Sequence, residues 1–248
     1  MVRSITLCML LIVAAGCSSP AQDAVEASGA DTLYEQVRAS RDGIGKRYMD
    51  REISQVMGHR GAAWLERPQR EREERTDLLI ENMTLTADAV VADIGAGTGY
   101  FSLELAERVP DGKVLAVDIQ PEMLEIIEAR TQELGVTNIE PVLGTERDPQ
   151  LPTDGVDVVL LVDAYHEFAY PYEMGRAMYE ALRPGGQLIL IEYRAEDPAV
   201  LIKPLHKMSE AQAKREMQAL GLRWVRTDDL LPQQHFMVFE KPAGVATP

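Results

Sequence analysis

Cysteine is scarce in this chain of 248 residues, and both copies stand near its start, as Cys8 and Cys17. No thiol occurs after residue 17, so the rest of the chain can form no disulfide and can use no thiol nucleophile. Positive charge is in deficit as well: 25 Lys and Arg residues face 40 Asp and Glu residues, for a net charge of −15 at pH 7. This balance argues against a protein that holds nucleic acid through its phosphates.

The chain also lacks a hydrophobic run long enough to span a bilayer comfortably. The apolar run near its start, Ile5 to Ala15, is too short. It follows Arg3 and ends at the sequence Ala-Ala-Gly-Cys, which resembles a bacterial lipoprotein signal. We therefore predict a signal peptide over residues 1–16 and a lipid on Cys17 that anchors an exported protein to a bacterial membrane, on the periplasmic side or the cell surface. Residues 17–31 are small and polar and predict a disordered tether.

An ordinary cleaved signal peptide and an uncleaved anchor are the alternatives to the lipoprotein signal. The acidic charge identifies no substrate, because it mostly favours solubility. The sequence indicates no protein partner.

The most informative stretch runs from Val90 to Asp118. Its residues predict a strand, a glycine turn, a helix, a second strand and a terminal acid, the first half of a nucleotide-binding βαβ unit. Gly95 and Gly97 lack a Cβ, so the turn can be tight and its backbone can lie close to a ligand. Asp118 ends the second strand, where its two carboxylate oxygens can accept hydrogen bonds from both hydroxyls of a ribose.

The glycine spacing indicates which nucleotide is bound. A Gly-x-Gly-x-x-Gly dinucleotide fingerprint does not fit. If it starts at Gly95 its last position is Tyr100, and if it starts at Gly97 its last position is Ser102. Instead, Asp-x-Gly-x-Gly-x-Gly runs from Asp93 to Gly99, and Asp118 follows at the end of the next strand. This pattern resembles the class I S-adenosylmethionine-dependent methyltransferases. The sequence Leu-Arg-Pro-Gly-Gly at residues 182–186 adds to a resemblance that covers residues 85–241.

Strand-like and helix-like segments alternate along residues 85–241, which predicts an α/β, Rossmann-like, doubly wound and mostly parallel sheet. The resemblance implies seven strands that end in an antiparallel pair. A hydrophobic fraction of 46% is enough for a full core. Residues 242–248 are predicted to be a flexible tail.

Residues 32–84 are predicted to be an N-terminal helical extension, with helices over residues 32–56 and 69–82. Because such extensions often cover the substrate side in the family, this one is predicted to be a lid whose Trp64 and Arg67 face the substrate. The alternative is that Trp64 packs the helices onto the domain while Arg67 caps a helix or forms an ion pair.

The resemblance implies S-adenosyl-L-methionine as the cofactor and a distinct role for each motif residue. Asp93 would organise the glycine turn and the amine of the cofactor, and Ile119 would cover one face of the adenine. Glu146, or a backbone carbonyl, would accept from the adenine amine. The remaining cofactor residues are Gly95, Ala96, Gly97 and Gly99 near the amino-acid part, Asp118 at the ribose and Asp163 near the methyl.

The chemistry of the acceptor is predicted at loops that follow the fourth and fifth strands. His166 would take the acceptor's proton and Tyr165 would orient it, unless His166 only makes a local hydrogen bond. Together with Asp163, these form the predicted catalytic set. Lys203 and His206 would receive an anionic group of the acceptor, with solvent-exposed charge as the alternative. No metal site is predicted, because His166, Glu167 and His206 lack a compact ligand spacing.

Two subclasses of the family are set aside. Asp163-Ala164-Tyr165-His166 does not match the Asn/Asp-Pro-Pro-aromatic motif of nucleic-acid amino-methyltransferases, and arsenite methylation requires several cysteines. The predicted function is methyl transfer by in-line displacement to a small-molecule or lipid-like acceptor. An exported protein that binds S-adenosylmethionine or a nucleoside without turnover is the alternative, and another nucleotide-dependent Rossmann enzyme is a weaker one.

Overall fold

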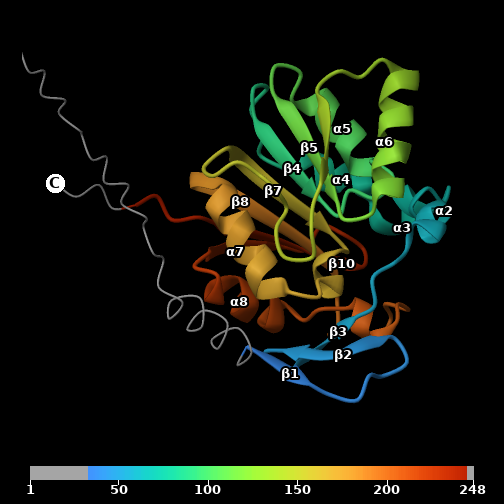
Figure 1. Ribbon diagram of the computed structural model, residues 1–248, viewed down its shortest axis with the longest axis vertical. Helices are drawn as coiled ribbons and strands as arrows, with labels where there is room; N and C mark the ends of the chain where they lie inside the picture. Colours follow the sequence, from blue (N-terminus) through green and yellow to red (C-terminus); the bar gives the residue numbers. More distant parts are fainter. Residues whose placement is uncertain (1–32, 245–248) are drawn as a thin grey trace, which may run out of the picture.

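A seven-stranded sheet forms the centre of the computed structural model, which describes residues 33–244 (Figure 1). Its strands lie in the order β6-β5-β4-β7-β8-β10-β9; β4 to β8 are parallel, and β10 runs antiparallel to both of its neighbours. The bounds are β4 Val90–Ile94, β5 Lys113–Asp118, β6 Ile139–Leu143, β7 Val156–Val162, β8 Leu182–Tyr193, β9 Arg223–Asp228 and β10 Gln234–Glu240. This architecture confirms the predicted α/β, doubly wound, mostly parallel fold.

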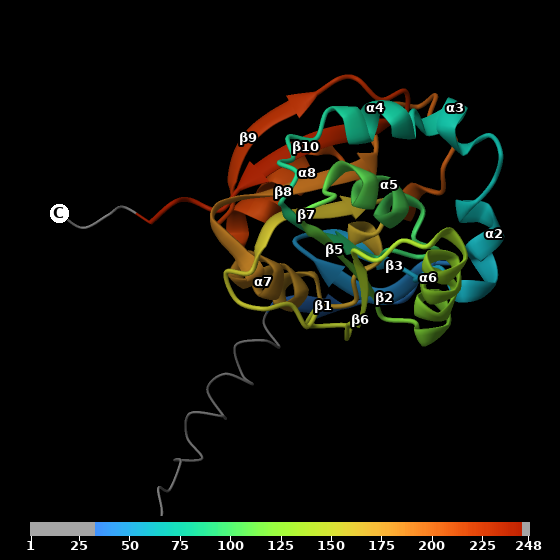
Figure 2. The same cartoon turned by 90° about the horizontal axis from the view of Figure 1, so that it is seen from above.

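Helices cover both faces of this sheet (Figures 1 and 2). Phe101 and Leu105 pack with Leu160 on the face covered by α4 and α5, whereas Met174 and Met178 lie in the cluster on the other face. Burial on both faces explains why the central strands read as apolar runs. The helices are α4 Thr76–Glu81, α5 Tyr100–Arg108, α6 Pro121–Leu134, α7 Pro171–Ala181 and α8 Glu210–Ala219.

The N-terminal extension begins with a second, three-stranded antiparallel sheet, so the prediction of a helix over residues 32–56 is wrong. The strands are β1 Tyr34–Gln36, β2 Gly43–Tyr48 and β3 Arg51–Ser54. Burial alternates over the first four residues of β2, which is the period of a strand and differs from that of a helix. Met49 and Asp50, with φ values of 47° and 69°, form the two-residue connection between β2 and β3.

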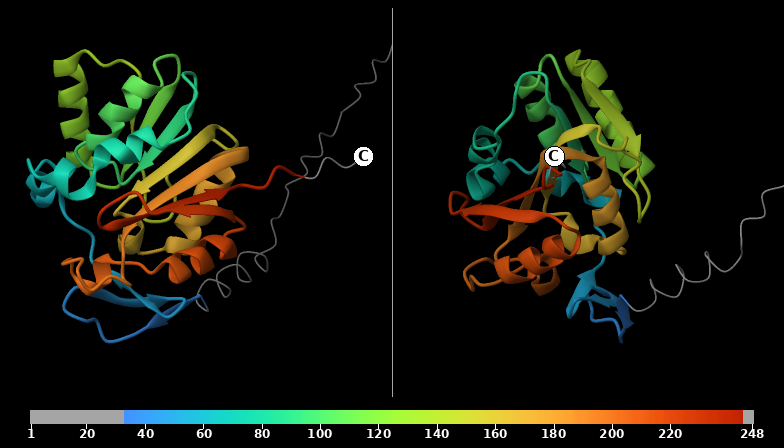
Figure 3. Two further views of the ribbon diagram at one scale, coloured as in Figure 1. Left: turned by 180° about the vertical axis from the view of Figure 1, so that it is seen from behind. Right: turned by 90° about the vertical axis from the view of Figure 1, so that its left-hand side faces the viewer.

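This small sheet packs against the part of the fold near the carboxyl ends of the parallel strands. Figures 1 and 3 show it beside α8, apart from the large sheet. Arg51 of β3 makes a two-bond ion pair with Glu216 of α8, at 2.8 and 2.9 Å, and also donates to the carbonyl of His166 at 3.2 Å. Lys46 of β2 donates to the carbonyl of Ala169 at 2.9 Å.

Short helices connect the small sheet to β4. They are η1 His59–Gly61, α2 Ala62–Leu65 and α3 Arg70–Glu74, followed by α4. The helix predicted over residues 69–82 is present but is split at Arg75, whose φ of 54° is left-handed. The extension therefore combines a sheet and short helices.

The predicted signal peptide over residues 1–16 and tether over residues 17–31 lie outside the described residues, as do the last four residues of the predicted tail. Within residues 33–244, no helix is both long and apolar enough to cross a membrane.

Replacing Arg51 with alanine should destabilise the protein by about 3–5 kcal/mol, because it leaves the fully buried Glu216 without its partner. The double replacement Arg51→Met with Glu216→Leu should recover most of that loss. Urea unfolding measures both free energies.

Arg47 on β2 provides the matched control, because its pair with Glu35 is 3.6 Å long and exposed. Arg47→Ala should cost less than about 1 kcal/mol. Equal losses for Arg47→Ala and Arg51→Ala would contradict the assignment of Arg51 as the anchor of the small sheet.

Candidate active site

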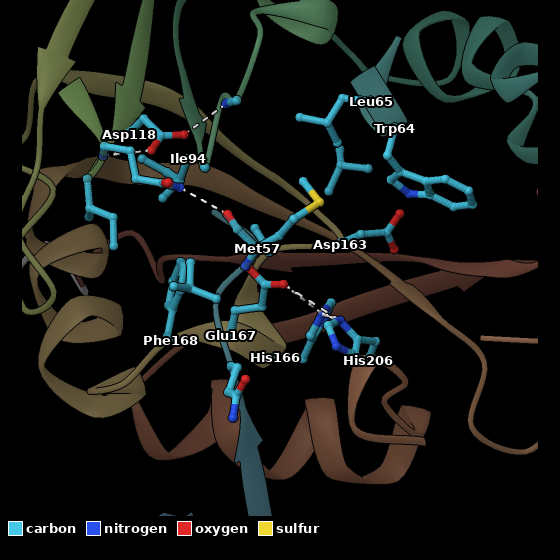
Figure 4. A pocket seen from close by; sticks show the side chains of 18 of the residues that line it. Met57, Trp64, Leu65, Ile94, Asp118, Asp163, His166, Glu167, Phe168 and His206 are labelled. Carbon is cyan, nitrogen blue, oxygen red and sulfur yellow. Dashed lines mark hydrogen bonds and ion pairs between the residues drawn. The ribbon is translucent and has the colours of Figure 1, made fainter. Parts of the chain in front are cut away.

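A cavity of about 630 Å³ lies at the carboxyl ends of the parallel strands (Figure 4). Its walls come from the segments that follow β4, β5, β7 and β8, and its cover comes from the N-terminal extension. The order of the strands reverses between β4 and β7, and ligands of open α/β sheets bind at such a switch point. The volume falls within the range of small-molecule sites, roughly 300–1,000 Å³.

The glycine turn after β4 forms one wall of this cavity. Gly95 and Gly97 both line it and have φ values of 75° and 57°, which favour glycine. A Cβ on Gly97 would lie 2.6 Å from Leu65 of α2, and one on Gly95 would lie 2.8 Å from Ala164. The glycines therefore also allow the cover and the loop after β7 to approach the turn closely.

Two other residues of the motif lie behind the turn and do not line the cavity. Ala96 packs in a cluster with Ile127 of α6, and a Cβ on Gly99 would lie 3.0 Å from the same side chain. Gly99 is the N-cap residue of α5. Their places in the motif are therefore explained by the packing of α5 and α6.

Asp118 lies at the cavity wall, as the spacing predicted. Its Oδ2 accepts from the amide of Gly97 and its Oδ1 from the amide of Gln120, each at 2.9 Å. Each carboxylate oxygen retains a further lone pair, so the residue fits the two hydroxyls of a ribose. Burial raises the pKa of Asp118. Ile119, which is 37% exposed, lines the cavity next to it and offers an apolar surface to an adenine.

Asp93 lies beneath the turn and outside the cavity wall. Its Oδ2 accepts from the hydroxyl of Ser102 at 2.6 Å, and burial raises its pKa to about 6. The structure thus supports its role in organising the turn and places it behind the surface that a ligand would meet.

A strap from the N-terminal extension crosses the cavity. The amide of Met57 donates to Glu167 at 3.0 Å, and its carbonyl accepts from Gln120 at 3.1 Å. Trp64 and Arg67 follow in the cover; both line the cavity, and the guanidinium of Arg67 lies 4.0 Å from the Trp64 ring. Trp64 is 51% exposed and is therefore available for contact with a ligand.

A buried ion-pair network supports this cover. The run of charged residues at 70–75 does not by itself reveal which of them are buried. Glu74 is only 2% exposed and accepts from Arg70 at 3.0 Å and from the hydroxyl of Tyr193 at 2.8 Å. Arg67 also pairs with Glu74. Arg67 therefore both forms an ion pair and lines the cavity.

Asp163, directly after β7, presents a buried carboxylate to the cavity. Its Oδ2 accepts from Gln234 at 3.0 Å, whereas its buried Oδ1 has no hydrogen-bond partner within the described part of the chain. Burial, together with the charges of Glu74 and Glu192, raises its pKa well above the usual range. A cationic ligand group beside the unpaired oxygen would offset this effect and favour the charged carboxylate.

His166, Glu167 and His206 form a polar cluster on the opposite side of the cavity from Asp118 (Figure 4). His166 Nε2 lies 3.1 Å from His206 Nδ1, and His166 Nδ1 lies 2.6 Å from Oε2 of the fully buried Glu192. Burial, together with the neighbouring His166 and Lys203, lowers the pKa of His206 to about 4, so its ring is neutral near pH 7.

The prediction that Tyr165 orients His166 is wrong. Tyr165 is fully buried in the hydrophobic core and does not line the cavity, and Glu192 holds the imidazole instead. A local spacing cannot reveal Glu192, because it stands on β8 and reaches His166 only when β7 and β8 pair.

The remaining predicted residues lie at the edge of the site. Lys203 lines the cavity, and its side chain, which is 62% exposed, pairs with Asp42 at 2.9 Å. Glu146 is exposed and also lines the cavity. Its contact with an adenine amine stays a prediction.

Comparison with known proteins shows what the central segment and the fold of this chain resemble. Residues 91–186 match a family model described as a methyltransferase domain. The fold resembles the crystal structure of a SAM-dependent methyltransferase from Aquifex aeolicus, with a TM-score of 0.70 and 22% identity, over 75% of this chain and 99% of that one. The central segment is thus similar to a methyltransferase domain, and the fold is that of the solved S-adenosylmethionine-dependent methyltransferase.

Curated relatives extend the similarity beyond the matched domain. An uncharacterised methyltransferase-like protein of Schizosaccharomyces pombe is 26% identical over 65% of this chain and 59% of its own length. The uncharacterised methyltransferase YcgJ of Bacillus subtilis is 29% identical over 58% of this chain and 57% of its own length. The chain thus spans less than two-thirds of the length of these relatives.

The raised pKa of Asp93 predicts a dependence of stability on pH. Its ordinary value of 3.8 rises to about 6 in the fold, so its contribution to stability is present below pH 3.8 and is lost as the pH rises through about 6. The loss amounts to roughly 3 kcal/mol at 1.36 kcal/mol per pKa unit. Asp93→Asn remains neutral and should therefore gain stability relative to the wild type between pH 4 and pH 8, as measured by urea unfolding.

The exposed Asp111 supplies the control for this comparison. Asp111→Asn should differ from the wild type by the same amount at both pH values. A constant difference for Asp93→Asn as well would show that its carboxyl titrates normally in the fold.

Proposed function

We propose that this chain transfers a methyl group from S-adenosylmethionine to a small-molecule or lipid-like acceptor inside the covered cavity. The observation that carries the proposal is the arrangement of one cavity: the glycine turn and Asp118 form one side, and the cluster around His166 forms the other. A single enclosed volume of about 630 Å³ can thus bring a nucleoside cofactor and an acceptor together.

The cofactor, when bound, supplies a methyl group on a positively charged sulfur, which an acceptor takes by in-line displacement. On the protein side, Asp118 accepts from the ribose hydroxyls, and Ile119 covers the adenine. The unpaired Oδ1 of Asp163 faces the positively charged end. Glu146 at the rim is the side chain proposed for the adenine amine.

The acceptor is proposed to lie between the cover and the cluster. This side of the cavity is closed by the small sheet, the strap at Met57 and α2. The cavity therefore suits a small or extended acceptor better than a folded macromolecule. His166 is proposed as the catalytic residue: Glu192 fixes its Nδ1, and its Nε2 can then take a proton. Trp64, Arg67, Lys203 and His206 are proposed to contact the acceptor.

We further propose that the protein is exported and anchored to a membrane by a lipid on Cys17, because the N-terminal sequence resembles a lipoprotein signal. This location conflicts with the cytoplasmic origin of S-adenosylmethionine. The conflict is the specific reason to retain the alternative function, in which the exported domain binds S-adenosylmethionine or another nucleoside without methyl transfer.

Asp118→Ala should weaken binding of S-adenosylmethionine by at least about 100-fold, because it removes two hydrogen bonds between a charged group and the ribose. Calorimetric titration of the cofactor and of its demethylated product into the full chain measures this loss. Asp111→Ala, which removes an exposed carboxylate just before β5, at the opposite end of that strand from Asp118, should bind as the wild type does.

The outcomes separate the proposed function from its alternatives. Unchanged affinity in Asp118→Ala would refute the role of that residue, and no binding by the intact chain would refute the methyltransferase assignment. Tight binding together with no labelling of any extract by a radioactive methyl donor would favour the non-catalytic alternative. Preference for a reduced nicotinamide would favour a different Rossmann enzyme.

The lipid anchor has its own test in the two cysteines. Cys17→Ser should abolish incorporation of labelled palmitate and move the protein out of the membrane fraction of a bacterial host, whereas Cys8→Ser should leave both unchanged. Labelling that persists in Cys17→Ser would contradict the proposed anchor.

A further inference from the structure

We propose that His166, Glu167 and His206 bind a divalent transition-metal ion at the acceptor side of the cavity. His166 and Glu167 lie in η2 Tyr165–Glu167, directly after β7, and His206 lies in η3 Pro204–His206, after β8. One donor atom from each residue lies within 4.8 Å of the other two. Figure 4 shows the three side chains converging from these two segments.

The distances between these atoms are close to those of a metal site. His166 Nε2 and His206 Nδ1 are 3.1 Å apart, and Glu167 Oε1 lies 3.6 Å from His206 Nδ1 and 3.8 Å from His166 Nε2. Zinc bonds of about 2.0–2.1 Å at tetrahedral angles place neighbouring donors about 3.3 Å apart. Shifts of a few tenths of an ångström would therefore bring all three atoms onto one ion.

Hydrogen bonds alone leave this cluster incomplete. His166 and His206 are within hydrogen-bond distance of each other, but Glu167 Oε1 is too far from either ring for a hydrogen bond. The other oxygen of Glu167 is held by the amide of Met57, which leaves Oε1 directed at the two rings. A cation at the centre would engage all three side chains.

The surroundings fix the ligands as they do in known metal sites. Glu192 accepts from His166 Nδ1 at 2.6 Å and from the backbone amide of His166 at 3.2 Å. This contact places the proton on Nδ1 and a lone pair on Nε2, and a carboxylate behind a ligating histidine is the usual outer partner. Arg51 also holds the carbonyl of His166 at 3.2 Å. The loop is therefore fixed from two sides.

Two imidazole nitrogens and one carboxylate are a ligand set for zinc, iron(II) and related ions, whereas Mg²⁺ and Ca²⁺ prefer all-oxygen sites. Three protein ligands beside a cavity leave at least one position open, as in catalytic sites. An acceptor hydroxyl or enol at that position would ionise more readily.

The role of the ion rests on the proposed function. The acceptor's proton would leave to water, a bond would form between the acceptor oxygen and the methyl carbon, and the carbon–sulfur bond would break with its electron pair on sulfur. The lone pair of His166 would then bind the metal rather than the acceptor's proton.

Calorimetric titration of Zn²⁺, Co²⁺ and Mg²⁺ into the chelator-treated full chain tests the site, in a background with Cys8→Ser and Cys17→Ser that removes both thiols. We expect one Zn²⁺ or Co²⁺ per chain and no comparable binding of Mg²⁺. His206→Ala and Glu167→Gln should each weaken binding by at least 10–100-fold, roughly the cost of disturbing even an outer partner. Bound Co²⁺ should show visible absorption bands that His206→Ala removes.

His235→Ala is the matched control, because His235 also faces a glutamate, Glu196, at 3.0 Å but belongs to no such cluster among residues 33–244. It should bind Zn²⁺ as the background does. The two replaced ligands, Glu167 and His206, are partly exposed, whereas the buried His166 is left in place. Thermal unfolding of each variant checks that it folds.

Absence of Zn²⁺ and Co²⁺ binding in the background, or unchanged affinity in His206→Ala, would overturn the metal site. Binding of the metal without binding of S-adenosylmethionine would retain the site and refute the proposed function. If the chain binds S-adenosylmethionine but binds neither Zn²⁺ nor Co²⁺, the metal site is refuted and the proposed function is retained.

Discussion

The site depends on one topological constraint, the reversal of strand order between β4 and β7. The chain leaves β4 toward β5 and β6, and it returns to the other side of β4 as β7 and β8. The segments after β4 and β7 therefore diverge at the carboxyl edge and leave a space between them. The glycine turn with Asp118 and the cluster around His166 lie on the two sides of that space, so both parts of the cavity come from one feature of the sheet.

The N-terminal extension completes the site and is tied to it by buried polar contacts. Arg51 connects the small sheet both to Glu216 and to the carbonyl of His166. The strap at Met57 is bonded to Glu167 on one side of the cavity and to Gln120 on the other. These contacts join the cover to the cluster around His166.

Several acidic side chains are buried in this protein. Glu74, Glu192 and Glu216 are nearly inaccessible, and each contacts a positive or donor group. Asp163 is the exception, since one of its oxygens is buried without a partner in the described part of the chain. A buried polar group that lacks a partner costs stability, which makes this oxygen a natural contact for a cationic ligand.

The sequence by itself determined the large sheet, the glycine turn and the place of Asp118, because these depend on local patterns: apolar runs, glycine spacing and an acid at a strand end. Only the tertiary structure decided the rest. The strands of the extension are held by contacts with distant segments, such as Arg51 with Glu216 of α8 and Lys46 with the carbonyl of Ala169. His206 meets His166 forty residues away, with Glu192 behind it, because β7 and β8 pair in parallel and carry their loops to one edge. Contacts between distant residues are set by strand pairing, which leaves no local spacing in the sequence.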